Sequence, residues 1–273
     1  MSRADRRDGE FPFLYVLGMH RSGTSAVTST LPHLGLCLTR EDELMEADKH
    51  NAKGYFESST LAFVNDAILG ALGGSWYLLP AVPDGWETFF LREPPRLSLC
   101  NAVASVVPDY VPVAWKDPRN CLTLPVWRSI ITRPSAAIFV YRCPAEVAAS
   151  LYARDSMPTQ HGRSLWEHYN RSAMRVMKDL PVLVVRYEEA LADAASFCEE
   201  VADFLTTLDI VSPEMMRCEE GARALDRSMR HERLEDIGDT VLDSQKELLE
   251  VLDSLRGAHS SWTVPDLDSQ SRC

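Results

Sequence analysis

Four short apolar runs alternate with helical patterns along the chain. The runs are residues 13–17, 111–115, 136–141 and 181–185. Their β-branched and aromatic residues follow one another without polar alternation, which is typical of strands in a parallel sheet covered on both faces. The helical patterns are residues 22–36, 58–72, 144–154 and 188–206. The pattern predicts an α/β fold, a three-layer sandwich in which right-handed crossovers place helices on both sides of a central parallel sheet.

Two stretches depart from this alternation. Residues 78–95 carry four prolines and show no strand or helix period, so we predict a long surface segment there. From residue 257 onward no period remains, which predicts a loosely held tail. Since no repeat or linker divides the chain, residues 11–256 are predicted to form a single domain, with flexible ends at 1–10 and 257–273.

The charge balance limits the classes of partner. The 273 residues carry a formal net charge of −12, so the surface as a whole repels nucleic acid and anionic membranes. We expect no nucleic-acid partner, and an anionic ligand would need a locally positive pocket. Seven scattered cysteines without a CxxC pair argue against a disulfide framework and a zinc cluster. No apolar run has the length of a membrane span or the form of a signal peptide, which predicts a cytoplasmic protein.

A glycine-containing turn follows the first apolar run. Gly18 and Gly23 enclose four residues, which is the spacing of a phosphate-binding P-loop. Glycines at these positions allow backbone amides to point at an anion. NTP-hydrolysing loops have a Lys after the second glycine, whereas this chain has Thr24 and carries its cation inside the loop, at Arg21. The turn therefore suits one terminal anionic group, and the alternative is a strand–helix turn that binds no ligand.

A second candidate for an anion site follows the third apolar run. Arg142 comes where that predicted strand ends, and Ser150 lies about two helical turns further on. The carboxyl ends of strands in α/β sheets are where ligands bind, and an Arg and a Ser together can bracket a phosphate by charge and by a hydroxyl donor. An Arg paired with a Glu, and a Ser packed against its own helix, is the structural alternative.

The two segments together resemble those of sulfotransferases that use PAPS (3′-phosphoadenosine 5′-phosphosulfate). GMHRSGTS, residues 18–25, is similar to the Arg-containing variant of the family's 5′-phosphosulfate loop, and Arg142 and Ser150 have the spacing of its 3′-phosphate motif. The resemblance implies a sulfotransferase-like P-loop architecture with PAPS as co-substrate. The loop residues that it assigns to PAPS are Gly18, His20, Arg21, Ser22, Gly23, Thr24 and Ser25.

Two further segments resemble the family's catalytic residues. Glu57 ends a GYFE sequence, where the resemblance implies a general base, and Lys116 opens a KDPR sequence, where it implies stabilisation of charge on the sulfuryl oxygens together with Arg21. Without the resemblance, Glu57 is a residue near a helix N-terminus and residues 116–119 are a solvated charge cluster. Because a sulfuryl group carries less charge than a phosphoryl group, Arg and Lys donors suffice and we expect no metal.

The choice of acceptor and two rival functions remain open at this level. A carbohydrate, a lipid headgroup or a small molecule offering a hydroxyl or an amine is compatible with these motifs. A P-loop nucleotide kinase or NTPase is one rival, and a nucleotide-binding protein without catalytic activity is the other. A basic patch in the acidic C-terminal region either completes the site or is a solvated helix face; its residues are Arg227, Arg230, His231 and Arg233.

Overall fold

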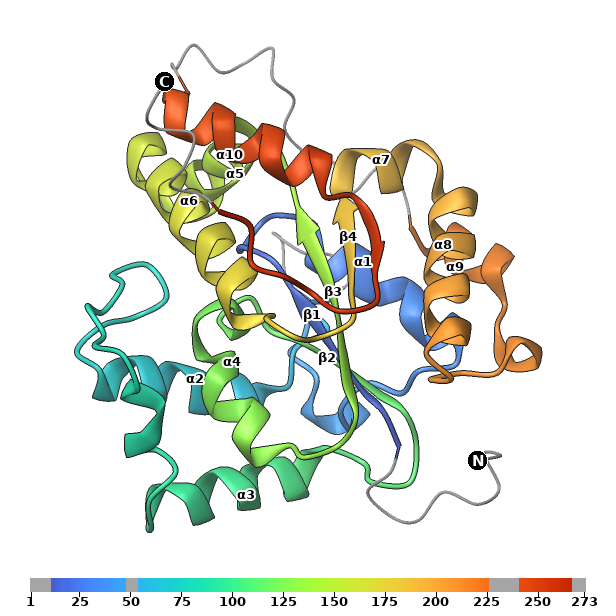
Figure 1. Ribbon diagram of the computed structural model, residues 1–273, viewed down its shortest axis with the longest axis horizontal. Helices are drawn as coiled ribbons and strands as arrows, with labels where there is room; N and C mark the ends of the chain where they lie inside the picture. The colour runs from blue at the N-terminus through green and yellow to red at the C-terminus, as the bar shows by residue number, and fades with distance from the viewer. Residues whose placement is uncertain (1–10, 48–53, 226–240, 267–273) are drawn as a thin grey trace.

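The computed structural model describes residues 11–47, 54–225 and 241–266, and its centre is a five-stranded sheet (Figure 1). The strands are β1 (Phe13–Leu17), β2 (Val113–Lys116), β3 (Ser135–Tyr141), β4 (Val182–Arg186) and β5 (Gly257–His259). Their order is β2-β1-β3-β4-β5, and all neighbours are parallel except β4 and β5. The predicted α/β fold is confirmed, with an antiparallel strand added at one edge.

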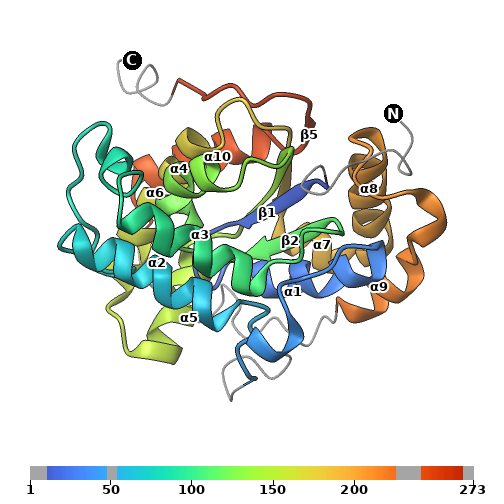
Figure 2. The same ribbon diagram turned by 90° about the horizontal axis from the view of Figure 1, so that it is seen from below.

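Helices cover both faces of this sheet, as Figures 1 and 2 show. One face packs against α2 (Ser59–Ala71), α3 (Pro95–Val106), α4 (Asn120–Ile130), α5 (Pro144–Asp155), α6 (Thr159–Val176) and α10 (Asp243–Ser254). The other packs against α1 (Thr24–Thr30), α7 (Tyr187–Ala192), α8 (Ala194–Thr207) and α9 (Cys218–Ala224). Strand β1 serves both cores, because Phe13 and Tyr15 point to the first and Leu14 and Val16 to the second. This is the three-layer arrangement that the uninterrupted apolar runs predict.

The strand order determines where a ligand can bind. The chain passes from β1 to β2 on one side and then to β3 on the other, so β1 lies between them. Val16 pairs with Lys116 of β2, and Leu17 pairs with Phe139 of β3. Open α/β sheets bind ligands outside the carboxyl ends of the strands where the order reverses. The turn after β1 occupies that position.

The C-terminal region differs from the prediction of a loosely held tail. Gly257–His259 forms β5, which pairs with β4 through Val182, Leu183 and Val184. Beyond it Trp262 is 1% exposed, and its indole Nε1 donates to the Met174 carbonyl. The tail prediction is therefore wrong for this stretch. A three-residue strand containing Gly, Ala and His has no apolar run to reveal it, and its pairing is supplied by the edge of β4.

The predicted helices differ from the structure in their ends. Helix α1 is seven residues long and continues into a 3₁₀ turn at Leu31–Leu34, so the pattern over 22–36 overestimates it. The pattern over 188–206 is two helices, because Asp193 has a ψ of 81°, outside the helical region, and caps α8 by accepting from the Ser196 backbone N–H. Within the described ranges, no helix is long and apolar enough to cross a membrane.

Candidate functional site

Two glycines shape the turn between β1 and α1. Gly18 and Gly23 have φ angles of 150° and 88°, which residues with a Cβ rarely adopt. A Cβ at Gly18 would lie 2.3 Å from the Val140 carbonyl oxygen, and one at Gly23 would lie 2.1 Å from the Tyr187 ring. Glycine is thus required at both positions by conformation and by space. The predicted P-loop spacing corresponds to a turn packed directly onto β3 and the start of α7.

Polar side chains inside this turn are buried without partners. Ser22 is fully buried, His20 is 7% exposed, and neither Ser22 Oγ nor His20 Nε2 has a hydrogen-bond partner among the described residues. The His20 ring packs 4.5 Å from the Trp76 ring, which belongs to the segment after α2. Burial, followed by the nearby cations of which Arg119 is the largest contributor, lowers the pKa of His20 well below its usual value, so the ring is neutral.

The two anion motifs meet at the C-terminal edge of the sheet. Arg21 has a left-handed φ of 68°, and its Nε donates to Ser150 Oγ over 2.8 Å. Arg142 donates from Nη1 to the Arg21 carbonyl oxygen over 3.3 Å. Residues more than 120 positions apart in the chain therefore form one cluster, as the strand order requires.

Arg142 is also paired with a Glu, as the structural alternative for this segment expects. Glu146 is fully buried, and its Oε2 accepts from Arg142 Nε at 2.9 Å and from Nη2 at 2.7 Å. Arg142 and Glu146 are four residues apart on either side of the start of α5, a spacing at which side chains meet. The guanidinium of Arg142 also lies 5.4 Å from the centroid of the Tyr187 ring. The charge of Arg142 is thus partly balanced within the protein.

Lys116 and Glu57 form a buried ion pair beside the loop. Lys116 Nζ lies 2.5 Å from Glu57 Oε1 and donates to Ser25 Oγ over 3.1 Å. The two side chains are 1% and 7% exposed. Ser25 in turn donates to the Tyr55 carbonyl over 3.2 Å. The turn between β1 and α1, the GYFE segment and the end of β2 are therefore joined through one ammonium group.

Arg119 extends this pair into a network. Its Nη1 lies 3.4 Å from Glu57 Oε2 and 3.0 Å from Asp117 Oδ1, and its Nε lies 2.6 Å from Asp66 Oδ1. Burial, together with repulsion from Asp117, raises the pKa of Glu57, although Lys116 and Arg119 act to lower it. A buried carboxylate with a raised pKa is a stronger base than an ordinary one.

The described arrangement can be compared with known structures. No protein-family model matches the chain, and no curated protein matches its sequence. Its structure matches the sulfotransferase domain of the Synechococcus PCC 7002 olefin synthase with a TM-score of 0.53 at 16% identity, over 91% of this chain and 96% of that one. It matches the sulfotransferase domain of the curacin biosynthetic pathway with a TM-score of 0.51 at 13% identity, over 89% of this chain and 98% of that one.

The chain has the sulfotransferase fold. This bears out the predicted resemblance at the level of architecture, since sequence identities this low carry the fold alone. Within that fold, all of the predicted site residues are described. The structure gathers them into two adjoining clusters: Lys116 and Glu57 contact the loop at Ser25, and Ser150 and Arg142 contact it at Arg21. Thr24, at the start of α1, packs its methyl group against Gly18.

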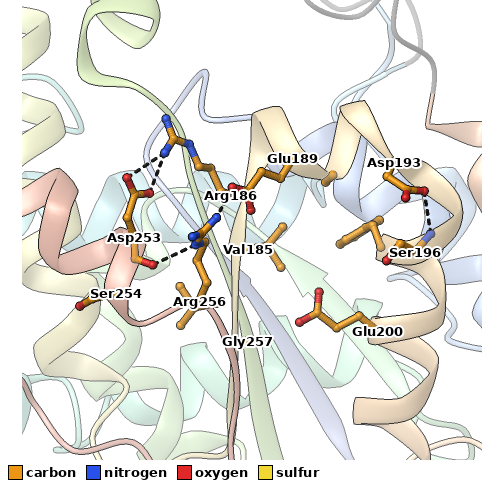
Figure 3. A pocket seen from close by; sticks show the side chains of 13 residues that line it. Val185, Arg186, Glu189, Asp193, Ser196, Glu200, Asp253, Ser254, Arg256 and Gly257 are labelled. Atoms are coloured by element: carbon orange, nitrogen blue, oxygen red, sulfur yellow. Dashed lines mark hydrogen bonds and ion pairs between the residues drawn. The ribbon is translucent and has the colours of Figure 1, made fainter.

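A separate cavity of this sulfotransferase fold lies at the β4–β5 edge (Figure 3). Its volume is about 530 Å³. Arg186 and Arg256 line it, but Arg186 pairs with Asp253 at 2.8 Å and Arg256 pairs with Glu189. Glu200 also lines it, and burial followed by repulsion from Glu189 raises its pKa. Because carboxylates outnumber cations there, this cavity does not suit a polyanionic nucleotide.

Two further predictions concern the basic patch and the absence of a metal. The patch at Arg227, Arg230, His231 and Arg233 lies outside the described residues. Within the described residues, no group of three or more His, Cys, Asp and Glu side chains is arranged to hold a metal ion. The alternative in which Arg142 pairs with a Glu is seen at Glu146, and Arg119 pairs with Asp117. The sequence did not indicate that Arg119 also contacts Glu57 and Asp66.

Proposed function

We propose that this chain transfers a sulfuryl group from PAPS to a hydroxyl or amine of an acceptor. The observation that carries the proposal is the position of Lys116, whose ammonium contacts both Ser25 of the loop and Glu57. An ammonium has three donors, and these two contacts use two of them. A cation and a base of this kind, side by side at the end of a phosphate-binding turn, can act on the two ends of one transfer reaction.

The loop residues fit the anionic end of such a donor. Ser22 Oγ is a buried hydroxyl without a partner in the described structure, and a buried polar group is costly unless it is hydrogen-bonded. Ligand oxygens would satisfy it. The turn that Gly18 and Gly23 allow packs onto β3 and α7, and Arg21 within it supplies a positive charge. Arg142 and Ser150 would hold the 3′-phosphate on the other side of Arg21.

The proposed reaction is a single displacement at sulfur. The acceptor oxygen or nitrogen forms a bond to sulfur while the bond between sulfur and the 5′-phosphate oxygen breaks, which leaves adenosine 3′,5′-bisphosphate. Glu57 takes the proton of the acceptor group, and its raised pKa favours this transfer. Lys116 and Arg21 neutralise charge that develops towards the leaving phosphate. Catalysis would consist of positioning and charge stabilisation, as in phosphoryl transfer.

A nucleotide kinase or NTPase is the alternative. The residue after Gly23 is Thr24, where that class has the Lys that reaches the β- and γ-phosphates. Lys116 comes instead from β2 and approaches Ser25 from the side of the acceptor base. This placement favours transfer of one terminal group without a second phosphate to hold.

The proposal is tested with PAPS carrying labelled sulfate. PAPS and adenosine 3′,5′-bisphosphate should raise the melting temperature, and a panel of alcohols, sugars and amines should include an acceptor that receives the label. ATP with magnesium serves as the comparison ligand. Stabilisation by ATP and magnesium but not by PAPS would favour the kinase. Stabilisation by PAPS, with no transfer to any member of the panel and none to water, would favour a binding protein.

A further inference from the structure

Asn65, on α2, makes every hydrogen bond that its side chain allows. It is fully buried. Its Oδ1 accepts from Thr123 Oγ1 and from Trp127 Nε1, both at 2.7 Å. Its Nδ2 donates to Asp117 Oδ2 at 2.9 Å and to Asn120 Oδ1 at 3.0 Å. An indole N–H can only donate, so Oδ1 must face Trp127, and Nδ2 is therefore turned towards Asp117.

This bond leads directly to the proposed base. With Oδ2 held by Asn65, Asp117 offers Oδ1 to Arg119, accepting from its backbone N–H at 2.9 Å and from Nη1 at 3.0 Å. The same Nη1 lies 3.4 Å from Glu57 Oε2. Three contacts thus join the Asn65 amide to the Glu57 carboxylate. Asp117 and Glu57 are both nearly fully buried, so each step is shielded from solvent.

We propose that Asn65 is a positioning residue, which fixes Asp117 and, through Arg119, holds Glu57 in the orientation that proton transfer requires. The inference rests on the proposed function and deepens it. Three carboxylates meet two cations here: Glu57, Asp117 and Asp66 face Lys116 and Arg119. In this cluster Arg119 can form ion pairs with any of three carboxylates. When Asp117 is held in one orientation, it determines which carboxylate oxygens Nη1 and Nε of Arg119 contact.

A purely structural role is the alternative, because a satisfied buried amide stabilises any fold. Asn65→Leu removes the amide at similar volume. We expect kcat to fall by about 10- to 100-fold, the scale of a misplaced catalytic group, while affinity for adenosine 3′,5′-bisphosphate stays unchanged. Thr123→Val is the matched control, since it removes a bond to Oδ1 and leaves Nδ2 on Asp117. Thr123 Oγ1 also lies 3.1 Å from the Arg119 main-chain carbonyl, but it makes no contact with the Arg119 guanidinium that faces Glu57. It should lower the melting temperature but keep kcat near the wild-type value.

A reversed pair provides the rescue. Asn65→Asp places a carboxylate against Asp117 Oδ2, and we expect kcat to fall as in Asn65→Leu. Adding Asp117→Asn restores one donor and one acceptor in reverse order and leaves an oxygen for Arg119. Partial recovery of kcat in the double variant, relative to both single variants, supports the proposal. Equal loss of stability and equal kcat in Asn65→Leu and Thr123→Val overturns it.

A second measurement separates this inference from the proposed function. Carbon-13 NMR titration of the Glu57 carboxyl, assigned with Glu57→Gln, needs no substrate. Loss of a firm Arg119 contact should move the Glu57 pKa upward in Asn65→Leu and leave it in place in Thr123→Val. If wild-type protein transfers no sulfuryl group but the titration shifts as expected, the proposed function fails and the positioning role stands. An unchanged Glu57 titration in Asn65→Leu removes the positioning role, whatever the activity.

Discussion

Two buried carboxylates, Glu57 and Glu146, each hold a cation at the same edge of the sheet, but they share it in different ways. Glu146 contacts Arg142 four residues away, where β3 meets α5. Glu57 contacts Lys116 and Arg119 from another part of the chain, and those cations contact further groups. The first pair is local, because its two residues are four positions apart across the start of α5. The second exists only when the segment before α2, the end of β2 and the loop are packed together, and it places a carboxylate beside the loop at Ser25.

The comparison predicts that changes at the Glu57 pair reduce turnover, whereas changes at the Arg142 pair reduce nucleotide binding. Glu57→Gln keeps the size of the side chain and most hydrogen bonds but removes the base. We expect the single-turnover rate to fall by about 10²- to 10⁴-fold, with little change in the affinity for adenosine 3′,5′-bisphosphate measured by calorimetry. Arg21→Ala, the contrasting variant, should reduce both. Near-normal turnover in Glu57→Gln would move the base elsewhere, with Asp117 the first residue to test.

Disabling the other end should affect binding instead. Arg142→Ala removes the proposed 3′-phosphate contact and should weaken binding of the bisphosphate by about 1.5–3 kcal/mol. Discrimination against adenosine 5′-phosphate should fall in the same variant. Arg154→Ala is the control, because Arg154 lies in the last turn of α5, which follows Arg142, and stacks over Trp76. Equal affinities in the two variants, with both folded, would remove Arg142 from the site.

The raised pKa of Glu57 makes the reacting end sensitive to pH. Glu57 must be deprotonated to act as a base, so kcat should rise with pH through the raised pKa, on a limb above the ordinary value of 4.5. At pH values below this pKa the rate should fall about tenfold per pH unit. The folded state also holds this proton to higher pH than the unfolded chain, so the group lowers stability as pH rises through the same window. A kcat profile that is flat down to pH 4.5 contradicts this assignment.

The smallest expected effect tests the local pair. Glu146→Gln leaves an oxygen to accept from Arg142 but removes the balancing charge, so the bisphosphate should bind about three- to tenfold more tightly. Calorimetric titration against the wild type measures this. Weaker binding would show that Glu146 chiefly orients Arg142. The negative charge of Glu146 would then not reduce the affinity for the bisphosphate.

The sequence predicts those parts of the molecule that local patterns encode. Strand β1 reads as five successive apolar residues, and Gly18 and Gly23 have the spacing of a phosphate-binding turn, so both are visible without the fold. Strand β5 is invisible because its pairing depends on β4, and the Asn65 bonds are invisible because their partners follow more than 50 residues later. An Asn in a helical pattern looks the same whether it faces solvent or a buried Asp.

The position of β1 between β2 and β3 has a consequence for the size of the ligand. Lys116 ends one neighbour of β1 and Arg142 follows the end of the other. Adjacent strands lie about 4.8 Å apart, so two cations carried by strands two places apart are separated at their base by about 10 Å. The strand spacing thus sets the distance between the main-chain positions of two cations, Lys116 and Arg142. A molecule that contacts both cations needs two anionic groups on opposite sides of a spacer, such as a ribose phosphorylated at its 3′ and 5′ positions. Under the proposed function, a nucleotide with only one of these groups would reach one cation at a time, so the strand spacing would favour a bisphosphate.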